Sequence, residues 1–170
     1  RALEVVERYG CGIAILTKSD LILRDLDILQ RINRRSKAVV QLSLTSMDDR
    51  LSRLIEPNVC PTTRRIEVLK AFQKAGIPTV VWLSPVLPWL NDTEENIRGI
   101  VEACADAGVK GIISFGMGLT LREGSREYYY SQLDRKFPGL KERTIRTYGC
   151  AYELRSAHQH ELNTLFHRLC

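Results

Sequence analysis

Four short apolar runs, rich in β-branched residues, recur along the first two thirds of the chain. They cover residues 12–17, 38–45, 79–87 and 109–115. A segment of helical periodicity lies in each gap between them, and strands that alternate with helices form βαβ units. The pattern therefore predicts an α/β fold with a four-stranded parallel sheet in sequential order.

The predicted crossover helices carry their apolar residues on one stripe, and they cover residues 20–35, 62–75 and 93–107. Gly76 and Gly108 follow the last two of these segments, as glycines do at helix C-termini. The third helix opens with the spacing of a capping box, with Asp92 in the cap position. We expect all three helices on one side of the sheet. Residues 2–9 read as the back half of a further helix.

The pattern changes after residue 119. Residues 120–170 contain no convincing strand and read as two or three helices around the turn Phe137-Pro138-Gly139. We interpret residues 1–119 as a partial α/β barrel and residues 120–170 as a helical extension packed on it. No linker or internal repeat separates the two parts into independent domains.

Composition adds that the chain is an ordinary globular protein. Its 170 residues are 44% hydrophobic and 26% charged. No apolar stretch approaches the roughly 20 residues that cross a bilayer, and the N-terminus does not resemble a signal peptide, so we expect a cytoplasmic protein without a membrane partner. Because residue 1 is Arg and the chain stops inside an amphipathic helix, we expect a fragment of a longer protein.

The cysteine pattern argues against a metal site within the chain. The five cysteines are widely scattered and form no C-x-x-C pair: Cys11, Cys60, Cys104, Cys150 and Cys170. Neither a disulfide framework nor a self-contained zinc site has this spacing. We expect reduced thiols, most of them buried as small apolar groups.

Small polar residues and one lysine stand where the predicted strands end. Lys18 follows the first strand, Ser43 lies on the second, Ser84-Pro85 lies within the third, and residues 114–118 (SFGMG) close the fourth. Ligands of parallel α/β proteins bind at this end of the sheet. One cation among small polar groups indicates an anionic or zwitterionic ligand. The alternative is that Lys18 reaches to solvent and the serines only fill space.

Several blocks together are similar to one enzyme family. ILTKSDLILRDLDIL, VVQLSLTSMDDRLSRLIEPN, RRIEVLKAFQKAGIPTVVWLSPVLPWLND and the ending YGCAYELRSAHQHELNTLFHRLC resemble the radical S-adenosylmethionine (SAM) enzymes. Within them, the blocks resemble the group of spore photoproduct lyase, often labelled DNA repair photolyase. The resemblance implies a lyase-like enzyme that cleaves SAM reductively at a [4Fe-4S] cluster and acts through a 5′-deoxyadenosyl radical on a substrate that the residues do not identify.

The resemblance also implies that part of the enzyme lies outside this sequence. The family binds its cluster with three cysteines spaced C-x3-C-x2-C, and no such spacing occurs here. The chain then corresponds to the last four strands of a six-stranded partial TIM-type barrel plus C-terminal helices. Its partner is the missing N-terminal part of the same protein. An exposed edge beside the first strand also allows self-association.

Two cofactor-binding residues follow from the resemblance. Lys18 matches a basic residue near the SAM carboxylate, and Ser43 matches a serine that hydrogen-bonds the same part of the cofactor. An ammonium and a hydroxyl suit that role. Glu56 and the arginines at positions 64 and 65 are weaker candidates, as an acidic and basic pair that shapes a loop over the cofactor. No catalytic residue is identified.

The charge balance leaves two other interpretations open. The net charge is +5, with basic clusters at residues 31–37, 64–65 and 143–146, so nucleic acid, DNA included, is a candidate partner. Arginines at helix ends are ordinary solvated residues, however, and no basic groove interleaved with aromatic residues is visible. The alternatives are a phosphometabolite-binding α/β protein that uses the SFGMG turn and no cluster, and a non-catalytic scaffold that binds nucleic acid.

Overall fold

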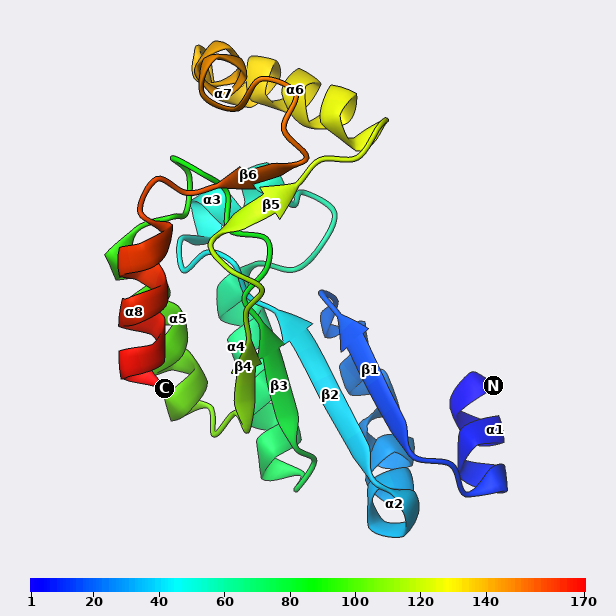
Figure 1. The fold of residues 1–170 in the computed structure, drawn as a ribbon. Helices are drawn as coiled ribbons and strands as arrows, with labels where there is room; N and C mark the ends of the chain where they lie inside the picture. Colours follow the sequence, from blue (N-terminus) through cyan, green and yellow to red (C-terminus); the bar gives the residue numbers. More distant parts are fainter.

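The four-stranded sheet has the predicted order. A computed structural model describes all residues, 1–170, and contains one parallel sheet in the order β1-β2-β3-β4 (Figure 1). Its strands are β1 (Ile13–Thr17), β2 (Ala38–Ser43), β3 (Thr79–Trp82) and β4 (Gly111–Ile113). The α/β fold class with four sequential parallel strands is therefore confirmed.

The crossover helices also lie where they were predicted, with two differences in extent and one in a cap. Thr93 caps the third crossover helix, where Asp92 was expected, and its hydroxyl accepts from the Asn96 N–H at 3.2 Å. The helices before residue 110 are α1 (Ala2–Tyr9), η1 (Asp20–Asp25), α2 (Leu26–Ser36), α3 (Asp49–Ile55), α4 (Thr62–Lys74) and α5 (Glu94–Asp106). The segment expected as one helix over 20–35 begins as the 3-10 helix η1, capped by the Ser19 side chain. Helix α3 was not predicted, because seven residues are too few to show a clear period; the Asp48 side chain caps it.

The two faces of the sheet differ sharply in what covers them. Alternate residues of β2, namely Ala38, Val40 and Leu42, are fully buried and belong to one cluster of 24 buried residues with α2, α4 and α5. Their neighbours along the strand, Gln41 and Ser43, point to the opposite face. On that face the edge strand β1 leaves Leu16 50% exposed. The helices thus cover one face of the sheet, as expected, and leave the other open.

The C-terminal region contains a strand that sequence analysis missed. Residues after 115 form β5 (Gly118–Thr120), α6 (Ser125–Lys136), α7 (Leu140–Tyr148), β6 (Glu153–Arg155) and α8 (Gln159–Leu169). Strands β5 and β6 pair antiparallel across more than 30 residues of chain, so the expectation of no strand in 120–170 is wrong. A strand of three residues is too short to show alternation, and its partner is distant in sequence. The division at 119 and 120 falls inside β5 and stays a prediction.

The third predicted strand is also shorter than expected. It ends at Trp82, because Pro85 and Pro88 have no backbone N–H to donate to a sheet. In Figure 1, β5 and β6 form a ribbon that connects α6 and α7 to the body, while α8 packs beside α5. No helix of the chain combines the length and apolar character that crossing a bilayer requires.

Candidate functional site

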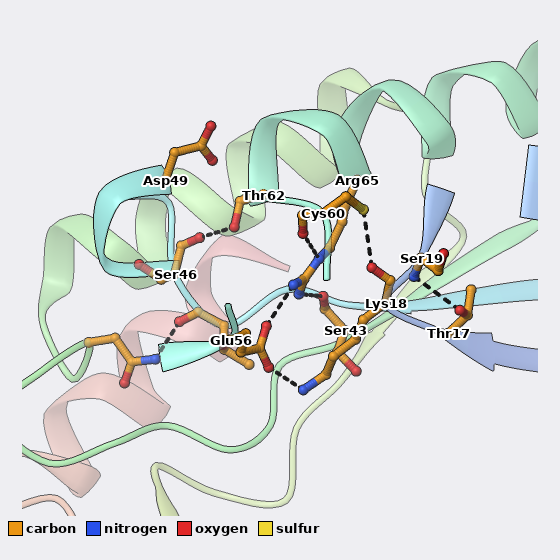
Figure 2. Close-up of polar contacts among 12 residues, drawn as sticks. Thr17, Lys18, Ser19, Ser43, Ser46, Asp49, Glu56, Cys60, Thr62 and Arg65 are labelled. Atoms are coloured by element: carbon orange, nitrogen blue, oxygen red, sulfur yellow. Dashed lines mark hydrogen bonds and ion pairs between the residues drawn. The ribbon is translucent and has the colours of Figure 1, made fainter. Parts of the chain in front are cut away.

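Lys18 and Ser43 lie at the same end of two neighbouring strands. Thr17 pairs with Leu42 in the parallel register, so the next residue of each chain segment, Lys18 and Ser43, stands at the carboxyl end of β1 and β2. Figure 2 shows both residues at this end, together with Glu56, Cys60 and Arg65. The structure thus brings the two residues predicted from the sequence into one neighbourhood. Their role in binding a cofactor stays a prediction.

Arg65 is the centre of this neighbourhood. Its side chain is only 1% exposed, and its three nitrogen atoms each donate to a different acceptor. Nε donates to the Cys60 carbonyl at 2.8 Å, Nη1 to the Ser43 carbonyl at 2.8 Å, and Nη2 to Glu56 Oε2 at 2.6 Å. The view of Arg65 as an ordinary solvated arginine at a helix start is therefore wrong. The helical stripe does not reveal this, because the acceptors come from other elements.

Glu56 connects the buried arginine to Lys18. Its carboxylate accepts from Arg65 through Oε2 and from the Lys18 ammonium through Oε1 (Figure 2). Burial alone would raise the pKa of Glu56, but the hydrogen bonds from Lys18 and Arg65 outweigh it and hold the pKa below the usual value of 4.5. Glu56 is therefore a carboxylate at neutral pH. Two cations around one carboxylate leave the group with one positive charge in excess.

The Lys18 ammonium retains capacity for a ligand. An ammonium has three N–H donors, and within the chain it finds a single acceptor, Glu56. Its side chain is 34% exposed, whereas that of Glu56 is 16% exposed. A partly exposed ammonium with free donors, held in place from behind, is suited to meet an anionic group.

The loops that form this end of the sheet are tied to one another. The Cys60 thiol donates to the Lys18 carbonyl at 3.1 Å, and the Thr62 hydroxyl donates to the Ser46 carbonyl at 2.5 Å. The amides of Asn91 and Asn96 both donate to the Thr45 carbonyl, at 2.7 and 2.9 Å. The segments after β1, β2 and β3 are therefore held in fixed relation by buried and partly buried hydrogen bonds.

The other half of the sheet end is open. Residues 114–118 turn from β4 into β5, with Gly116 at φ 103°, and no helix begins there. The phosphate-binding interpretation of SFGMG therefore lacks the helix N-terminus that would stabilise an anion. Beside this turn lies a cavity of about 710 Å³, lined by residues of β5, β6 and α8 as well as Ser84 and Phe115.

Two features of this half were not found from the sequence. Phe115 is a large exposed aromatic residue next to the cavity, and Trp82 donates its indole N–H to Gln41 Oε1 at 2.6 Å. Phe115 was placed at the end of the apolar run 109–115 and in the SFGMG turn, and neither placement indicates an exposed ring. Gln41 lies on the same face of β2 as Ser43, and nothing in the sequence indicates its link to Trp82.

Many of the basic residues are engaged in ion pairs. Arg31 pairs with Glu7 and Asp27, and Arg64 pairs with Asp20 and Glu67. These pairs lie at the surface, where they contribute little stability but reduce the free positive charge. Nucleic acid as a partner stays a prediction.

The thiols do not converge on one point. Cys11, Cys150 and Cys170 are exposed, Cys60 is intermediate and Cys104 is buried. The expectation that most of the thiols are buried is therefore wrong. No group of three or more His, Cys, Asp or Glu side chains lies close enough together to hold a metal ion. The residues of this chain therefore do not fit an iron–sulfur cluster, which requires converging thiolates.

Comparison with known sequences finds relatives that are longer than this chain. No family model matches it. An uncharacterized protein of Mycobacterium tuberculosis is 32% identical over 134 residues, which is 79% of this chain and 39% of that protein. An uncharacterized protein of Acidianus two-tailed virus is 30% identical over 145 residues, 84% of this chain and 47% of that protein. The chain thus spans less than half the length of these relatives.

Solved structures with a similar fold are radical SAM enzymes. A spore photoproduct lyase mutant with bound AdoMet and dinucleoside spore photoproduct has a TM-score of 0.66 and 14% identity, over 99% of this chain and 51% of that one. A domain of the pyruvate-formate lyase-activating enzyme of Bacteroides vulgatus has a TM-score of 0.53 and 17% identity, over 79% and 84%. The chain has the fold of a partial radical SAM barrel.

Proposed function

We propose that this chain is the C-terminal part of a radical SAM enzyme of the spore photoproduct lyase-like group and that it binds the amino-acid end of SAM. The observation that carries the proposal is the Lys18 ammonium, held by Glu56 at the carboxyl end of β1 with free donors. The fold neighbour with bound AdoMet supports the choice of ligand. The four strands then form part of a barrel whose remaining strands belong to the longer protein.

Each residue of the group has a distinct task in this proposal. Lys18 donates a charge-assisted hydrogen bond to the carboxylate of SAM, and the Ser43 hydroxyl forms a hydrogen bond to the same end of the cofactor. Arg65 holds Glu56 and the Ser43 backbone, so that both binding residues are fixed from the buried side. The single excess positive charge of Lys18, Glu56 and Arg65 matches one ligand carboxylate.

The cofactor supplies the radical chemistry, because SAM bound beside a reducing [4Fe-4S] cluster is a source of the 5′-deoxyadenosyl radical. The cysteines of this chain do not converge, so the proposal assigns the cluster ligands to the longer protein and none to this chain. The residues described here act on the cofactor by binding and orienting it.

The test is a calorimetric titration of the longer protein, with its cluster reconstituted anaerobically, against SAM. Lys18→Ala removes a charge-assisted hydrogen bond worth about 1.5–3 kcal/mol, so the SAM dissociation constant should rise about 10- to 150-fold. Lys110→Ala is the matched control, because Lys110 is exposed at the opposite end of the sheet, next to β4.

Titration with a second ligand tests whether Lys18 acts on the amino-acid end of SAM. 5′-Methylthioadenosine has the adenosine and sulfur of SAM but neither its carboxylate nor its amine, so Lys18→Ala should leave its affinity unchanged. The proposal is wrong if the wild-type protein does not bind SAM, or if Lys18→Ala and Lys110→Ala bind SAM equally well.

A further inference from the structure

A second, smaller cavity of the chain is acidic, and Lys18 does not line it. It has a volume of about 390 Å³ and lies between the end of the loop after β3, the start of α5 and the start of α8. Three of its lining residues are carboxylates, and none is Lys or Arg. The apolar part of its wall comes from Trp89 and Leu162. This combination of walls indicates a ligand with both an apolar and a cationic part.

Asp92 is the buried carboxylate of this cavity. It is only 7% exposed, and its side chain forms a single hydrogen bond, in which the Ser156 hydroxyl donates to Oδ2 at 2.6 Å. The Oδ1 atom receives no donor from the chain, and no basic side chain pairs with the carboxylate. A buried carboxylate is unfavourable unless a cation or several donors match it. Because Asp92 lines the cavity, a cationic ligand there would supply what the chain does not.

The charges around the cavity leave an excess of negative charge. Asp92, Glu94 and Glu161 each contribute a carboxylate to the wall. Glu94 and Glu161 stand in the first turns of α5 and α8, where each helix N-terminus contributes about half a positive charge. The Arg143 guanidinium beside Trp89 adds one further positive charge. The carboxylates therefore exceed the positive groups by about one charge, which matches a ligand with a single positive charge.

The apolar wall of the cavity is held in place by α7. The guanidinium carbon of Arg143 lies 4.6 Å from the centroid of the Trp89 ring, and the centroid of the Tyr148 ring lies 5.7 Å from it. Leu162, on α8, is buried and adds a second apolar surface to the wall. An indole fixed in this way offers a hydrocarbon chain a surface that needs little rearrangement on binding.

We propose that this cavity binds a primary alkylammonium group. The ammonium donates to Oδ1 of Asp92, and its hydrocarbon stem packs on Trp89 and Leu162, as the stems of lysine side chains pack on apolar surfaces. A guanidinium fits less well, because Ser156 occupies Oδ2 and leaves one carboxylate oxygen where a bidentate pair needs two. A metal ion fits less well too, because no three His, Cys, Asp or Glu side chains converge. The inference goes beyond the proposed function and does not depend on it.

The probes for the test are butylamine and 1-butanol, titrated separately into this chain at pH 7 and constant ionic strength. They have the same hydrocarbon stem, but only the amine is charged at this pH. Binding is followed through the indole N–H signal of Trp89 in proton–nitrogen NMR spectra; the chain has two tryptophans, and Trp82→Phe assigns the signals. For ligands of this size we expect a dissociation constant in the millimolar range for butylamine, and at least tenfold weaker binding of 1-butanol.

Asp92→Asn should weaken butylamine binding about 5- to 30-fold, because it removes the charge that the ammonium meets. Glu102→Gln is the matched control: it removes one negative charge from the same helix, α5, at an exposed position that does not line the cavity, and it should leave binding unchanged. Far-ultraviolet circular dichroism and a melting curve verify the fold of each variant. If Asp92→Asn does not fold, Glu161→Gln, at an exposed lining residue, replaces it and should weaken binding about 2-fold.

Three results would each overturn the inference: equal affinity for butylamine and 1-butanol, equal butylamine affinity in the lining variant and in Glu102→Gln, or no saturable binding of butylamine up to about 100 mM. A lysine with both backbone ends blocked distinguishes the two sources of an alkylammonium group. If it binds as tightly as butylamine, the cavity accepts a lysine side chain of a partner protein. If it binds much more weakly while butylamine binds, the site takes a free amine.

Discussion

The two halves of the sheet's carboxyl end are built in opposite ways. At β1 and β2, the connection through α3 and α4 folds back over the strand ends and buries the Arg65 guanidinium against Glu56 and the Ser43 carbonyl. At β3 and β4, the chain turns away into the β5–β6 ribbon and leaves the Phe115 ring beside an open cavity. One half holds a charge in place, and the other leaves room for a ligand.

The difference follows from what each half must stabilise. A buried guanidinium is unfavourable unless its donors are matched, so the β1–β2 half is closely packed and rich in hydrogen bonds. An aromatic ring has no such requirement and can stay exposed at modest cost. The stability of the fold should therefore depend strongly on the first half and weakly on the second.

The largest effect is expected from Arg65→Met. This substitution leaves Glu56 Oε2 and two carbonyls without their donor and should lower the free energy of unfolding by about 3–5 kcal/mol, measured by urea denaturation. Arg64→Met is the control, because the neighbouring Arg64 is 43% exposed and its surface ion pairs contribute about 0–1 kcal/mol. Similar losses of stability in the two variants would show that the buried Arg65 contributes no more to folding than the exposed Arg64.

A smaller loss of stability is expected when the Asn91 side chain, which connects the two halves, is removed. The Asn91 side chain accepts from the Leu87 N–H at 2.5 Å and donates to the Thr45 carbonyl, so it links the loop after β3 to the end of β2. Asn91→Ala should reduce stability by about 1–3 kcal/mol, because it leaves buried partners unsatisfied. Asn58→Ala, at an exposed loop position, should change it little. Equal effects in urea denaturation would contradict the bridging role.

Glu56 should make the stability of the β1–β2 half depend on pH in the acid range. Its pKa is lower in the folded chain than its usual value of 4.5, so the unfolded state binds the proton first as the pH falls. The stabilisation is then complete above about pH 4.5 and is lost as the pH falls through the lower, folded-state pKa. Protonation of Glu56 replaces its charge-assisted hydrogen bonds with weaker, neutral ones. Each bond then loses about 1 kcal/mol of stabilisation.

The measurement is urea denaturation of the wild type and of Glu56→Gln between pH 3 and pH 7. Glu56→Gln should be less stable than the wild type at pH 7, and the difference should shrink as the pH falls below about 4.5. A difference that stays constant over this range would contradict the proposed titration of Glu56.

The smallest effect is expected from Phe115→Ala, which should change the free energy of unfolding by at most about 0.5 kcal/mol, as exposed positions do. Phe72→Ala is the matched control, because the Phe72 ring is fully buried under the sheet and its loss should cost about 3–5 kcal/mol. A large loss in thermal or urea denaturation of Phe115→Ala would mean that the ring serves packing and that the open half resembles the closed one.

Local patterns were sufficient for most of the fold. The runs at 12–17 and 38–45 predicted β1 and β2 closely, and the helix stop at Gly76 lies two residues after the last residue of α4. Each of these signals depends on residues close in sequence, such as an apolar period, a cap or a glycine. Strands β5 and β6 have no such local signal, because each has three residues and its partner is more than 30 residues away.

The candidate site divides in the same way. The sequence places Lys18 and Ser43 where predicted strands end, and the resemblance to the radical SAM enzymes singled out these two residues as binding residues. The pairing of Glu56 with Arg65 was considered only as a loop feature, and its extension to Lys18 was not predicted. The link from Gln41 through Trp82 to Phe115 was missed entirely.

The amino-acid sequence by itself determined the alternation of strands and helices, their order in the sheet and the end of the sheet at which Lys18 stands, because hydrophobic periodicity and right-handed crossovers act over short segments. Only the tertiary structure decided that Arg65 is buried and Phe115 exposed. Both residues have neighbours from distant parts of the chain. The burial of a side chain depends on what packs against it in three dimensions, and its own residue type and local period do not contain that information.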